Sequence, residues 1–250
     1  IRALADAMRD GDVETLIVIG ANPVATAPAD ADLAGALENV ANVVHMGLYR
    51  DETALAARWH VPMAHHLETW GDARAFDGTA AIQQPIIQPF YGGRSPLELL
   101  ALLTGTPDAT AHDLVRATWE AQVDGPFDAF WRDAVHRGAI PGTEAPTTIT
   151  DRPRAPEALP RDAGELVLWL RPDPSIEDGR WANNGWLQEL PKPFTKLTWD
   201  NAALVSARTA EALGVRNEDL LEIDRDGARV TAPVWILPGQ ADGVVQLHFG

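Results

Sequence analysis

The sequence Trp181-Ala-Asn-Asn-Gly-Trp-Leu-Gln-Glu-Leu-Pro-Lys-Pro-Phe-Thr-Lys-Leu-Thr-Trp-Asp-Asn201 places three tryptophans, three asparagines and two prolines within 21 residues. Because a buried indole N–H needs a hydrogen-bond partner, tryptophan is seldom concentrated in an ordinary surface loop. The segment therefore predicts a tightly packed corner between two domains, with Trp181, Trp186 and Trp199 in the hinge. If its ring is buried there, Trp186→Ala should destabilise the protein by ~3–5 kcal/mol.

The residues around and after this segment show the pattern of short strands. The expected strands are Glu165–Arg171, Thr195–Trp199, Leu220–Arg225, Ala228–Leu237 and Val244–Phe249. A hairpin turn is expected at Asp226-Gly227, and one helix, Ser206–Leu213, should stop at Gly214. The chain begins at Ile1 without methionine and ends just after an apolar run, so we expect a fragment whose β-barrel is incomplete.

The first part of the chain has the pattern of a parallel α/β sheet. Residues 15–20, Thr-Leu-Ile-Val-Ile-Gly, predict a strand that is covered on both faces. We expect a helix before it at Ile1–Arg9, a second helix near Asp32–Val40 capped by Asp30, and a strand at Asn42–Met46. A short helix over Tyr49–Arg58 and an extended piece at Trp59–Pro62 should follow.

The middle of the chain predicts a helical extension and a linker. Proline, glycine and glutamine dominate residues 70–95, which predicts a long irregular segment. Ser95, Pro96 and Glu98 form a helix start with a capping box. Helical spacing continues over 112–121 and 126–137, and residues 138–161 contain five prolines without an apolar period. The fold class is thus α/β: residues 1–140 form a Rossmann-like domain with a helical extension, 141–164 a linker, and 165–250 a truncated β-barrel domain.

Composition excludes several classes of function. A formal net charge of −16 disfavours binding to nucleic acid, and the absence of cysteine excludes disulfides, thiolate catalysis and iron–sulfur ligation within these residues. No apolar run is long enough to span a bilayer. His60, His65 and His66 lack the spacing of a metal site, because Pro62 breaks any helix between them.

Candidate chemical groups occur at two places. The carboxylates of Glu68, Asp72 and Asp77 could perform acid–base chemistry only if two of them met in a cleft, and capping of nearby turns is the simpler interpretation. Residues 20–23, Gly-Ala-Asn-Pro, follow the first parallel strand, where ligands bind in open α/β sheets. This loop is either a plain turn or a site where Gly20 admits a phosphate or ribose and Asn22 hydrogen-bonds to it. No residue is assigned a catalytic or metal-binding role.

Several motifs, in this order, resemble one family. They are Gly20–Pro23, the run Pro62–Asp72 leading to Asp77-Gly78 and Gln84–Pro89, the segments Asn183–Pro193 and Thr195–Asn201, and the distal helix and strand with Pro238-Gly239. Together they resemble the later part of a molybdopterin oxidoreductase of the dimethyl sulfoxide reductase superfamily. Within it, the chain is most similar to the iron–sulfur/molybdopterin-like large subunit of alternative complex III.

The resemblance implies a Rossmann-like domain followed by a double-psi β-barrel, with a molybdopterin guanine dinucleotide held between domains. By position, Gly20, Asn22 and Pro23 match the loop that contacts one pterin nucleotide, and Asn201 lies near the corresponding barrel contact. In the alternative complex III branch this domain is understood to lack the molybdenum cofactor. Electrons there pass through iron–sulfur clusters in a separate ferredoxin-like domain, which this cysteine-free piece does not contain.

Three functions remain open. The first is a scaffold in a quinol-oxidising respiratory complex, peripheral on the periplasmic side of the bacterial inner membrane, that contacts other subunits and the protein's own cluster-bearing domain. The second is the catalytic subunit of a genuine molybdopterin oxidoreductase. The third, a dehydrogenase that binds a nicotinamide dinucleotide, has Glu38 near the required spacing but lacks the glycine-rich loop. Of these, we expect the first.

Overall fold

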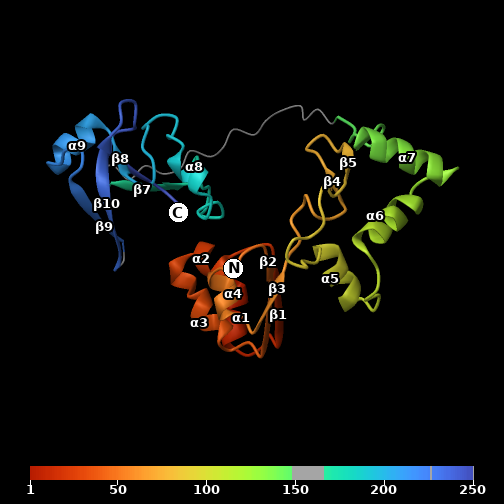
Figure 1. Cartoon of the computed structure of the whole chain (residues 1–250). Coiled ribbons are helices and arrows are strands. Elements are labelled where there is room, and N and C mark those ends of the chain that lie inside the picture. The colour runs from red at the N-terminus through yellow and green to blue at the C-terminus, as the bar shows by residue number, and fades with distance from the viewer. Residues whose placement is uncertain (148–165, 226, 250) are drawn as a thin grey trace. The chain divides into compact units, whose positions relative to one another are not determined.

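The computed structural model describes residues 1–147, 166–225 and 227–249. The chain divides into two compact units, Ile1–Pro153 and Arg154–Gly250 (Figure 1). From residue 148 onward, the predicted linker lies outside the described residues. None of the helices in the described ranges is long and apolar enough to cross a membrane.

The first unit contains a parallel three-stranded sheet in the order β1-β2-β3, which confirms the predicted parallel sheet. Its elements, red to orange in Figure 1, are α1 (Arg2–Arg9), β1 (Thr15–Ile19), α2 (Pro23–Thr26), a 3-10 turn (Ala29–Ala31), α3 (Leu33–Leu37), β2 (Asn42–Gly47), α4 (Glu52–Ala56) and β3 (Trp59–Pro62). Met8 of α1, Leu37 of α3 and Val43 of β2 belong to one buried cluster, so these helices and the sheet share a core.

Two local predictions in this sheet were wrong. The cap of α3 is Asp32 instead of Asp30, because Asp30 is taken into the 3-10 turn while the Asp32 carboxylate accepts a hydrogen bond from the Gly35 amide at 3.2 Å. The strand β1 was expected to be covered on both faces, but none of its residues is fully buried. A continuous β-branched run therefore identified the strand correctly and overstated its burial.

The rest of the first unit consists of a small antiparallel sheet and three helices. The sheet, β4-β5-β6, is formed by Gly71–Arg74, Ala80–Gln83 and Ala139–Ile140. The helices are α5 (Pro96–Leu103), α6 (Ala111–Glu120) and α7 (Phe127–Arg137). The predicted capping box is present, since Ser95 Oγ accepts from the Glu98 amide at 3.1 Å and the Glu98 carboxylate accepts from the Ser95 amide at 2.7 Å.

This small sheet corrects one further prediction. Residues 70–95 are not irregular throughout, because β4 and β5 pair there, and a short third strand, β6, at Ala139–Ile140 completes the sheet just before the expected linker. The strands have four, four and two residues, which is too short for a periodic pattern to stand out from a loop. Their burial depends on distant residues, since Ile82 and Ile140 share a cluster with Val115, Trp119 and Trp131.

The second unit is a curled five-stranded half-barrel in the order β7-β11-β8-β10-β9. Its strands are β7 (Val167–Arg171), β8 (Ala203–Val205), β9 (Leu220–Arg225), β10 (Ala228–Ile236) and β11 (Val244–His248), and its helices are α8 (Gly185–Glu189) and α9 (Ala207–Leu213). The predicted stop of α9 is confirmed by Gly214, which has a φ of 68°. Arg225 pairs with Ala228 in the antiparallel register of β9 and β10, and the predicted turn at Asp226-Gly227 lies partly outside the described residues.

The strand predicted at Thr195–Trp199 is absent from the described structure, and β8 occupies the sheet instead. Lys196 and Trp199 have φ angles of 63° and 64°, a left-handed conformation that cannot continue a strand. The strand β8 has only three residues, all buried, so its pattern is equally compatible with a short loop in the core. The apolar residues in 181–201, the Trp-rich segment, thus led to a prediction that placed one strand of the sheet at the wrong residues.

Within the second unit, the three tryptophans are not buried. The exposed fractions are 45% for Trp181, 86% for Trp186 and 59% for Trp199. The segment is held by polar groups: the Asn184 side chain caps α8, and the Trp199 amide donates to the Gln188 carbonyl at 3.0 Å. The second unit by itself therefore forms no packed indole cluster, and a corner between domains stays a prediction.

Trp186→Ala is accordingly expected to change the free energy of unfolding by less than about 0.5 kcal/mol, because an exposed ring loses little packing. Urea denaturation followed by circular dichroism measures this change. A loss near the 3–5 kcal/mol typical of a buried aromatic would mean that the ring packs against something in solution.

Candidate functional site

The predicted ligand loop lies at the carboxyl edge of the parallel sheet. Gly20 follows β1 with a φ of 65°, and its amide donates to the Met46 carbonyl at 2.8 Å. The Asn22 side chain donates to Glu52 Oε2 at 2.7 Å and accepts from the Thr53 amide and hydroxyl at 3.2 and 2.8 Å. Pro23 opens α2. The loop is thus fastened to the start of α4.

These bonds give Asn22 a structural role within the chain. Its bond to Glu52 is the main cause that lowers the pKa of that carboxyl group, so Glu52 stays ionised near neutral pH. A phosphate brought to the Asn22 amide would approach this carboxylate and be repelled by it. The nucleotide-binding roles of Gly20, Asn22 and Pro23 therefore remain predictions that no contact in this loop tests.

The carboxylates Glu68, Asp72 and Asp77 do not converge. Glu68 accepts from the His65 and Phe90 amides at 2.9 and 3.2 Å, and these bonds lower its pKa. Asp72 accepts from the indole of Trp119 at 2.8 Å. Asp77 accepts from the amide of Thr79 at 2.9 Å. Each carboxylate thus fixes a separate turn or side chain, as the simpler sequence interpretation holds.

The histidines that drew attention in the sequence are separated in the same way. The rings of His65 and His66 lie 3.9 Å apart between centroids, whereas His60 pairs with His45 on the neighbouring strand. Among the described residues, no group of three or more potential metal-ligating side chains was found.

The second unit contains a cavity of about 360 Å³ with a basic lining. Arg171 at the end of β7 and Lys192 of the Trp-rich segment supply its charges, and no carboxylate occurs among the described residues that line it. Four prolines, Phe194, Leu204 and Leu237 form its apolar walls. In a chain with a net charge of −16, this combination fits an anionic ligand with a planar or apolar part.

Two polar side chains of this cavity are of particular interest. Gln240 Nε2 is buried without a hydrogen-bond partner, the one such side-chain nitrogen or oxygen in the described ranges. A buried donor without a partner costs free energy, so its position favours a ligand that supplies an acceptor. His248 Nε2 lies 3.2 Å from Gln246 Nε2, a donor, which assigns the lone pair to this ring nitrogen.

The environment of His248 keeps its ring neutral. Burial is the largest cause that lowers its pKa, the nearby cations Lys192 and Arg171 lower it further, and Asp173 acts in the opposite direction. A neutral ring with its proton on Nδ1 offers one further donor without adding charge. The cavity therefore presents fixed cations together with neutral donors.

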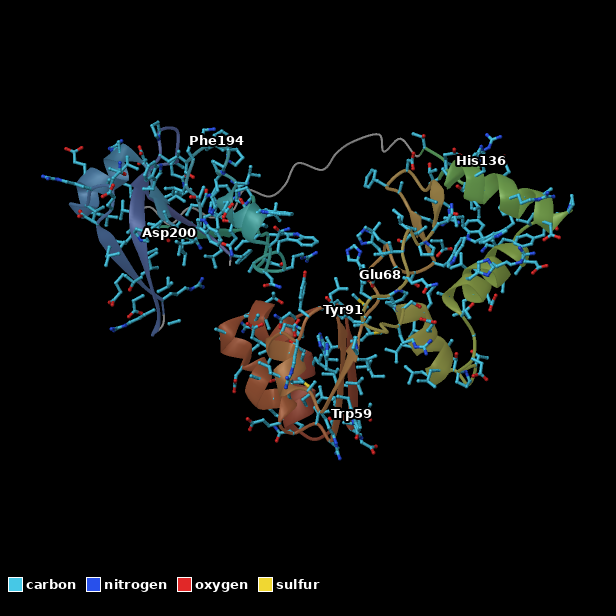
Figure 2. The ribbon with its side chains drawn as sticks, viewed as in Figure 1. Trp59, Glu68, Tyr91, His136, Phe194 and Asp200 are labelled. Carbon is cyan, nitrogen blue, oxygen red and sulfur yellow. The ribbon has the colours of Figure 1, made fainter. Side chains whose placement is uncertain are left out.

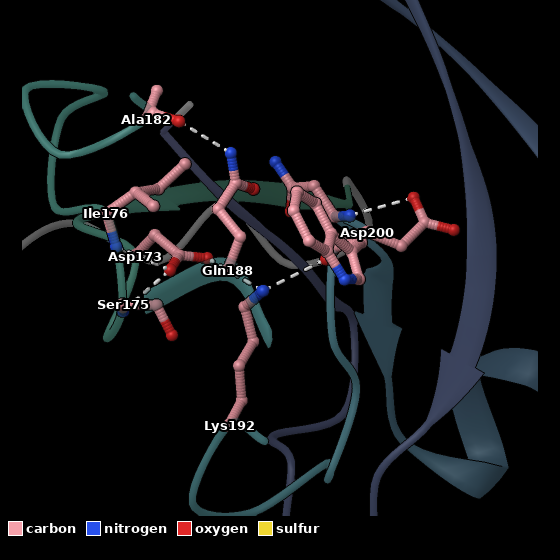
Figure 3. Close-up of a pocket in the computed structure, with 9 residues that line it drawn as sticks. Asp173, Ser175, Ile176, Ala182, Gln188, Lys192 and Asp200 are labelled. Carbon is pink, nitrogen blue, oxygen red and sulfur yellow. Dashed lines mark hydrogen bonds and ion pairs between the residues drawn. The ribbon is translucent and has the colours of Figure 1, made fainter. Parts of the chain in front are cut away.

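A smaller cavity of about 150 Å³ lies beside the Trp-rich segment (Figure 3). Lys192 also lines this cavity, where its ammonium group lies 3.4 Å from Asp173 Oδ2 and donates to the Asp200 carbonyl at 3.0 Å. The side chains of Lys192 and Asp173 are only 12% and 3% exposed. This ion pair closes the segment onto the loop that follows β7.

Asn201, the residue predicted near the barrel contact, lines the smaller cavity. Its side-chain Nδ2 donates to the His248 backbone carbonyl at 2.7 Å, and its side-chain Oδ1 accepts from the His248 backbone amide at 3.4 Å. Asn201 therefore fixes the backbone of a residue that lines the larger cavity. Its own contact with a ligand stays a prediction.

The sequence did not single out Arg171, Lys192, Gln240 or His248. They come from β7, the Trp-rich segment, the loop after β10 and β11, which lie up to 77 positions apart and meet only in the folded sheet. The one available signal was Pro238-Gly239, which precedes Gln240 and was noted among the family motifs.

Comparisons with known proteins identify the fold. No protein family model and no curated protein sequence matches the chain. Among solved structures, the chain resembles acetylene hydratase from Pelobacter acetylenicus with a TM-score of 0.75 at 15% sequence identity. The match covers 98% of this chain and 38% of that chain, so the described units share the fold of part of that enzyme.

Proposed function

We propose that this chain is the part of a molybdopterin-type enzyme that binds the nucleotide of the cofactor. The sequence motifs resemble that superfamily, and the fold resembles acetylene hydratase, a molybdopterin enzyme of the dimethyl sulfoxide reductase family. The match covers only 38% of the length of that enzyme. An enzymatic activity of the whole protein is therefore proposed, and the fold alone does not establish it.

The larger cavity of the second unit carries the proposal. Arg171 and Lys192 would neutralise the phosphates of a nucleotide, and the buried Gln240 amide would donate to one of its oxygens. The apolar walls, including Phe194, suit the flat face of a heterocycle. The residues present therefore fit an anionic heterocyclic cofactor better than a neutral apolar ligand.

When bound, such a cofactor supplies the molybdenum centre, and the residues of this chain bind and orient it. Arg171 would hold negative charge in the cavity, Gln240 and His248 would donate hydrogen bonds from neutral groups, and Asn201 keeps His248 in position. The absence of a carboxylate from the described lining also selects against cationic ligands.

The second candidate is a scaffold in a periplasmic, membrane-associated respiratory complex, in which the fold is kept without the cofactor. It is favoured by the exposed aromatic residues, such as Tyr91 and Phe194, which are 88% and 87% exposed (Figure 2). Such side chains are typical of interfaces with other subunits. Molybdenum and pterin content of the purified full-length protein separates the two proposals: one molybdenum per chain supports cofactor binding, and none supports the scaffold.

Arg171→Met is expected to weaken binding of guanosine diphosphate, used as a probe for the nucleotide, by roughly tenfold, because it removes a charge-assisted contact worth at least 1.4 kcal/mol. Titration calorimetry on full-length protein from a host unable to make the cofactor measures this affinity. Arg208→Met is the matched control, since Arg208 is 84% exposed on α9 and does not line the cavity. Equal affinities for both variants and the wild type would reject the assignment of the cavity.

A further inference from the structure

A pair of histidines, one fully buried and one half-buried, lies beneath the loop that follows β1. His45 on β2 and His60 on β3 are direct partners in the parallel register, and their rings stack with centroids 5.1 Å apart. His45 is completely buried, and its Nδ1 lies 3.0 Å from Nδ1 of His60. On the other side of the ring, His45 Nε2 lies 3.2 Å from the Ala21 carbonyl oxygen.

These distances favour one arrangement of the protons in the neutral pair. The Ala21 carbonyl can only accept, so a bond to it requires a proton on His45 Nε2, and Nδ1 of a neutral His45 must then accept from His60. His60 accordingly carries its proton on Nδ1, and its Nε2 keeps a lone pair. The arrangement is a chain of two hydrogen bonds that ends at the backbone of the β1–α2 loop.

The pair can take up one proton without losing this chain. A proton added at His60 Nε2 leaves both hydrogen bonds in place, and if the bridging proton then moves to His45 Nδ1, its Nε2 still donates to Ala21. A second proton would put hydrogen on both Nδ1 atoms across 3.0 Å, where neither can accept. The Nδ1 contact therefore accommodates one extra proton on the two rings and not two.

One alternative arrangement exists only for the neutral pair. If the bridging proton belonged to His45, its Nε2 would face the Ala21 oxygen with a lone pair, and the loop would lose its bond. In the singly protonated pair, every placement of the proton leaves hydrogen on His45 Nε2. Proton uptake thus makes the bond to the loop obligatory.

The charged groups around the pair come from the turn after β2 and from α4. Asp51 Oδ1, which also caps α4, lies 3.8 Å from His45 Nε2, and Arg50 and Glu52 are its neighbours in the chain. Burial is the main cause that lowers the pKa of His60, His45 and Arg50 lower it further, and Asp51 opposes them. With the pair neutral, these three side chains carry a net charge of −1, and one proton on the pair balances it.

We propose that His45 and His60 form a single proton-binding site whose occupancy locks the β1–α2 loop through the Ala21 carbonyl. The ligand is one proton, which enters at His60 Nε2 and is shared across the Nδ1 contact. The inference concerns this edge of the sheet alone and holds whether or not a cofactor binds in the second unit.

Nuclear magnetic resonance of the full chain tests the proposal, with imidazole nitrogens and loop amides followed between pH 8 and pH 5. We expect His60 to take up a proton as the pH falls, and the amides of Ala21 and Asn22 to shift together with its ring nitrogens. In His60→Asn, whose side-chain amide can still donate to His45 but cannot bind a proton, the loop shifts should be lost. His136→Asn, on α7, should leave them unchanged.

Uptake of two protons in this range, or loop shifts that persist in His60→Asn, would overturn the proposal. If His60→Asn proves poorly folded, the wild-type titration still decides: the loop amides either follow the pair or do not. Failure of this test leaves the proposed cofactor binding untouched, because that proposal depends on nucleotide binding and molybdenum content.

The same pair predicts how stability depends on pH. The pKa of His60 is lower in the folded protein than in the unfolded chain, so the unfolded state binds more protons between the two values. The free energy of unfolding should therefore fall as the pH drops below about 6.5, the ordinary pKa of histidine. Urea denaturation at several pH values should show a shallower fall for His60→Asn than for the wild type, and equal slopes would contradict the lowered pKa.

Discussion

Replacing Lys192 by methionine is expected to lower the free energy of unfolding by about 3 kcal/mol, because removal of one member of a buried ion pair leaves the other uncompensated. Methionine keeps the length of the side chain and removes the charge. Asp173, which is 3% exposed, would keep its hydrogen bonds from the Ser175 and Ile176 amides at 2.7 and 3.1 Å but lose its cation. Urea denaturation followed by circular dichroism measures the loss.

A double variant distinguishes the ion pair from simple packing. Asp173→Asn combined with Lys192→Met removes both charges, so most of the stability should return. Lys196→Met is the matched control: Lys196 is exposed and donates to the Pro193 carbonyl at 2.9 Å, so its loss should cost less than about 0.5 kcal/mol. If the single Lys192 variant were as stable as this control, the ion pair with Asp173 would contribute nothing to the free energy of unfolding.

The same double variant has a functional use. It should fold, and it removes one positive and one negative charge together, so the net charge at this place is unchanged. Guanosine diphosphate should then bind more weakly than to the wild type only through the loss of a direct contact with the Lys192 ammonium group. Lys192 thus belongs to two structures at once, the ion pair that orders the Trp-rich segment and the basic lining of the cavity. Comparison of unfolding and binding in one protein separates these contributions.

The parts of the fold that could be predicted are those with strong local signals. The β-branched run of β1, the capping box at Ser95 and Glu98, and the glycine that ends α9 each specify a conformation through neighbouring residues. The short strands β6 and β8 could not be predicted, because their stability comes from pairing and burial against distant residues. The Trp-rich segment was hard to interpret for a related reason: the number of aromatic residues in a segment does not show whether their rings are buried.

The candidate site was less accessible from the sequence than the fold. Asn201 was named through a resemblance, whereas the unpaired Gln240 amide can be recognised only once the surrounding atoms are placed. His45 was not considered as a site residue, because the sequence placed it within an ordinary strand. Its partner is 15 positions away, and the contact follows from the parallel register of β2 and β3, which the sequence does not state.

Gly47→Ala tests the space that the histidine pair requires, and we expect it to cost about 2–3 kcal/mol, the upper range for overpacking of a buried site. A Cβ atom at Gly47 would lie 2.5 Å from Cε1 and 2.9 Å from Nε2 of His45. The ring cannot turn away freely, because it is fully buried and is bonded to both His60 and the Ala21 carbonyl. Urea denaturation measures the loss, and the imidazole nitrogen spectrum should show the Nδ1 contact broken.

Two further variants make the cause of that loss specific. Gly71→Ala places a Cβ atom 3.4 Å from Nε2 of Gln83, an ordinary van der Waals contact, so it should change stability little. In a His45→Ala background, Gly47→Ala should become nearly neutral, because the ring that it strikes is gone. If Gly47→Ala lowers the free energy of unfolding by as much without the His45 ring as with it, glycine is required there for its backbone conformation. The interpretation that Gly47 leaves room for the His45 ring would then be rejected.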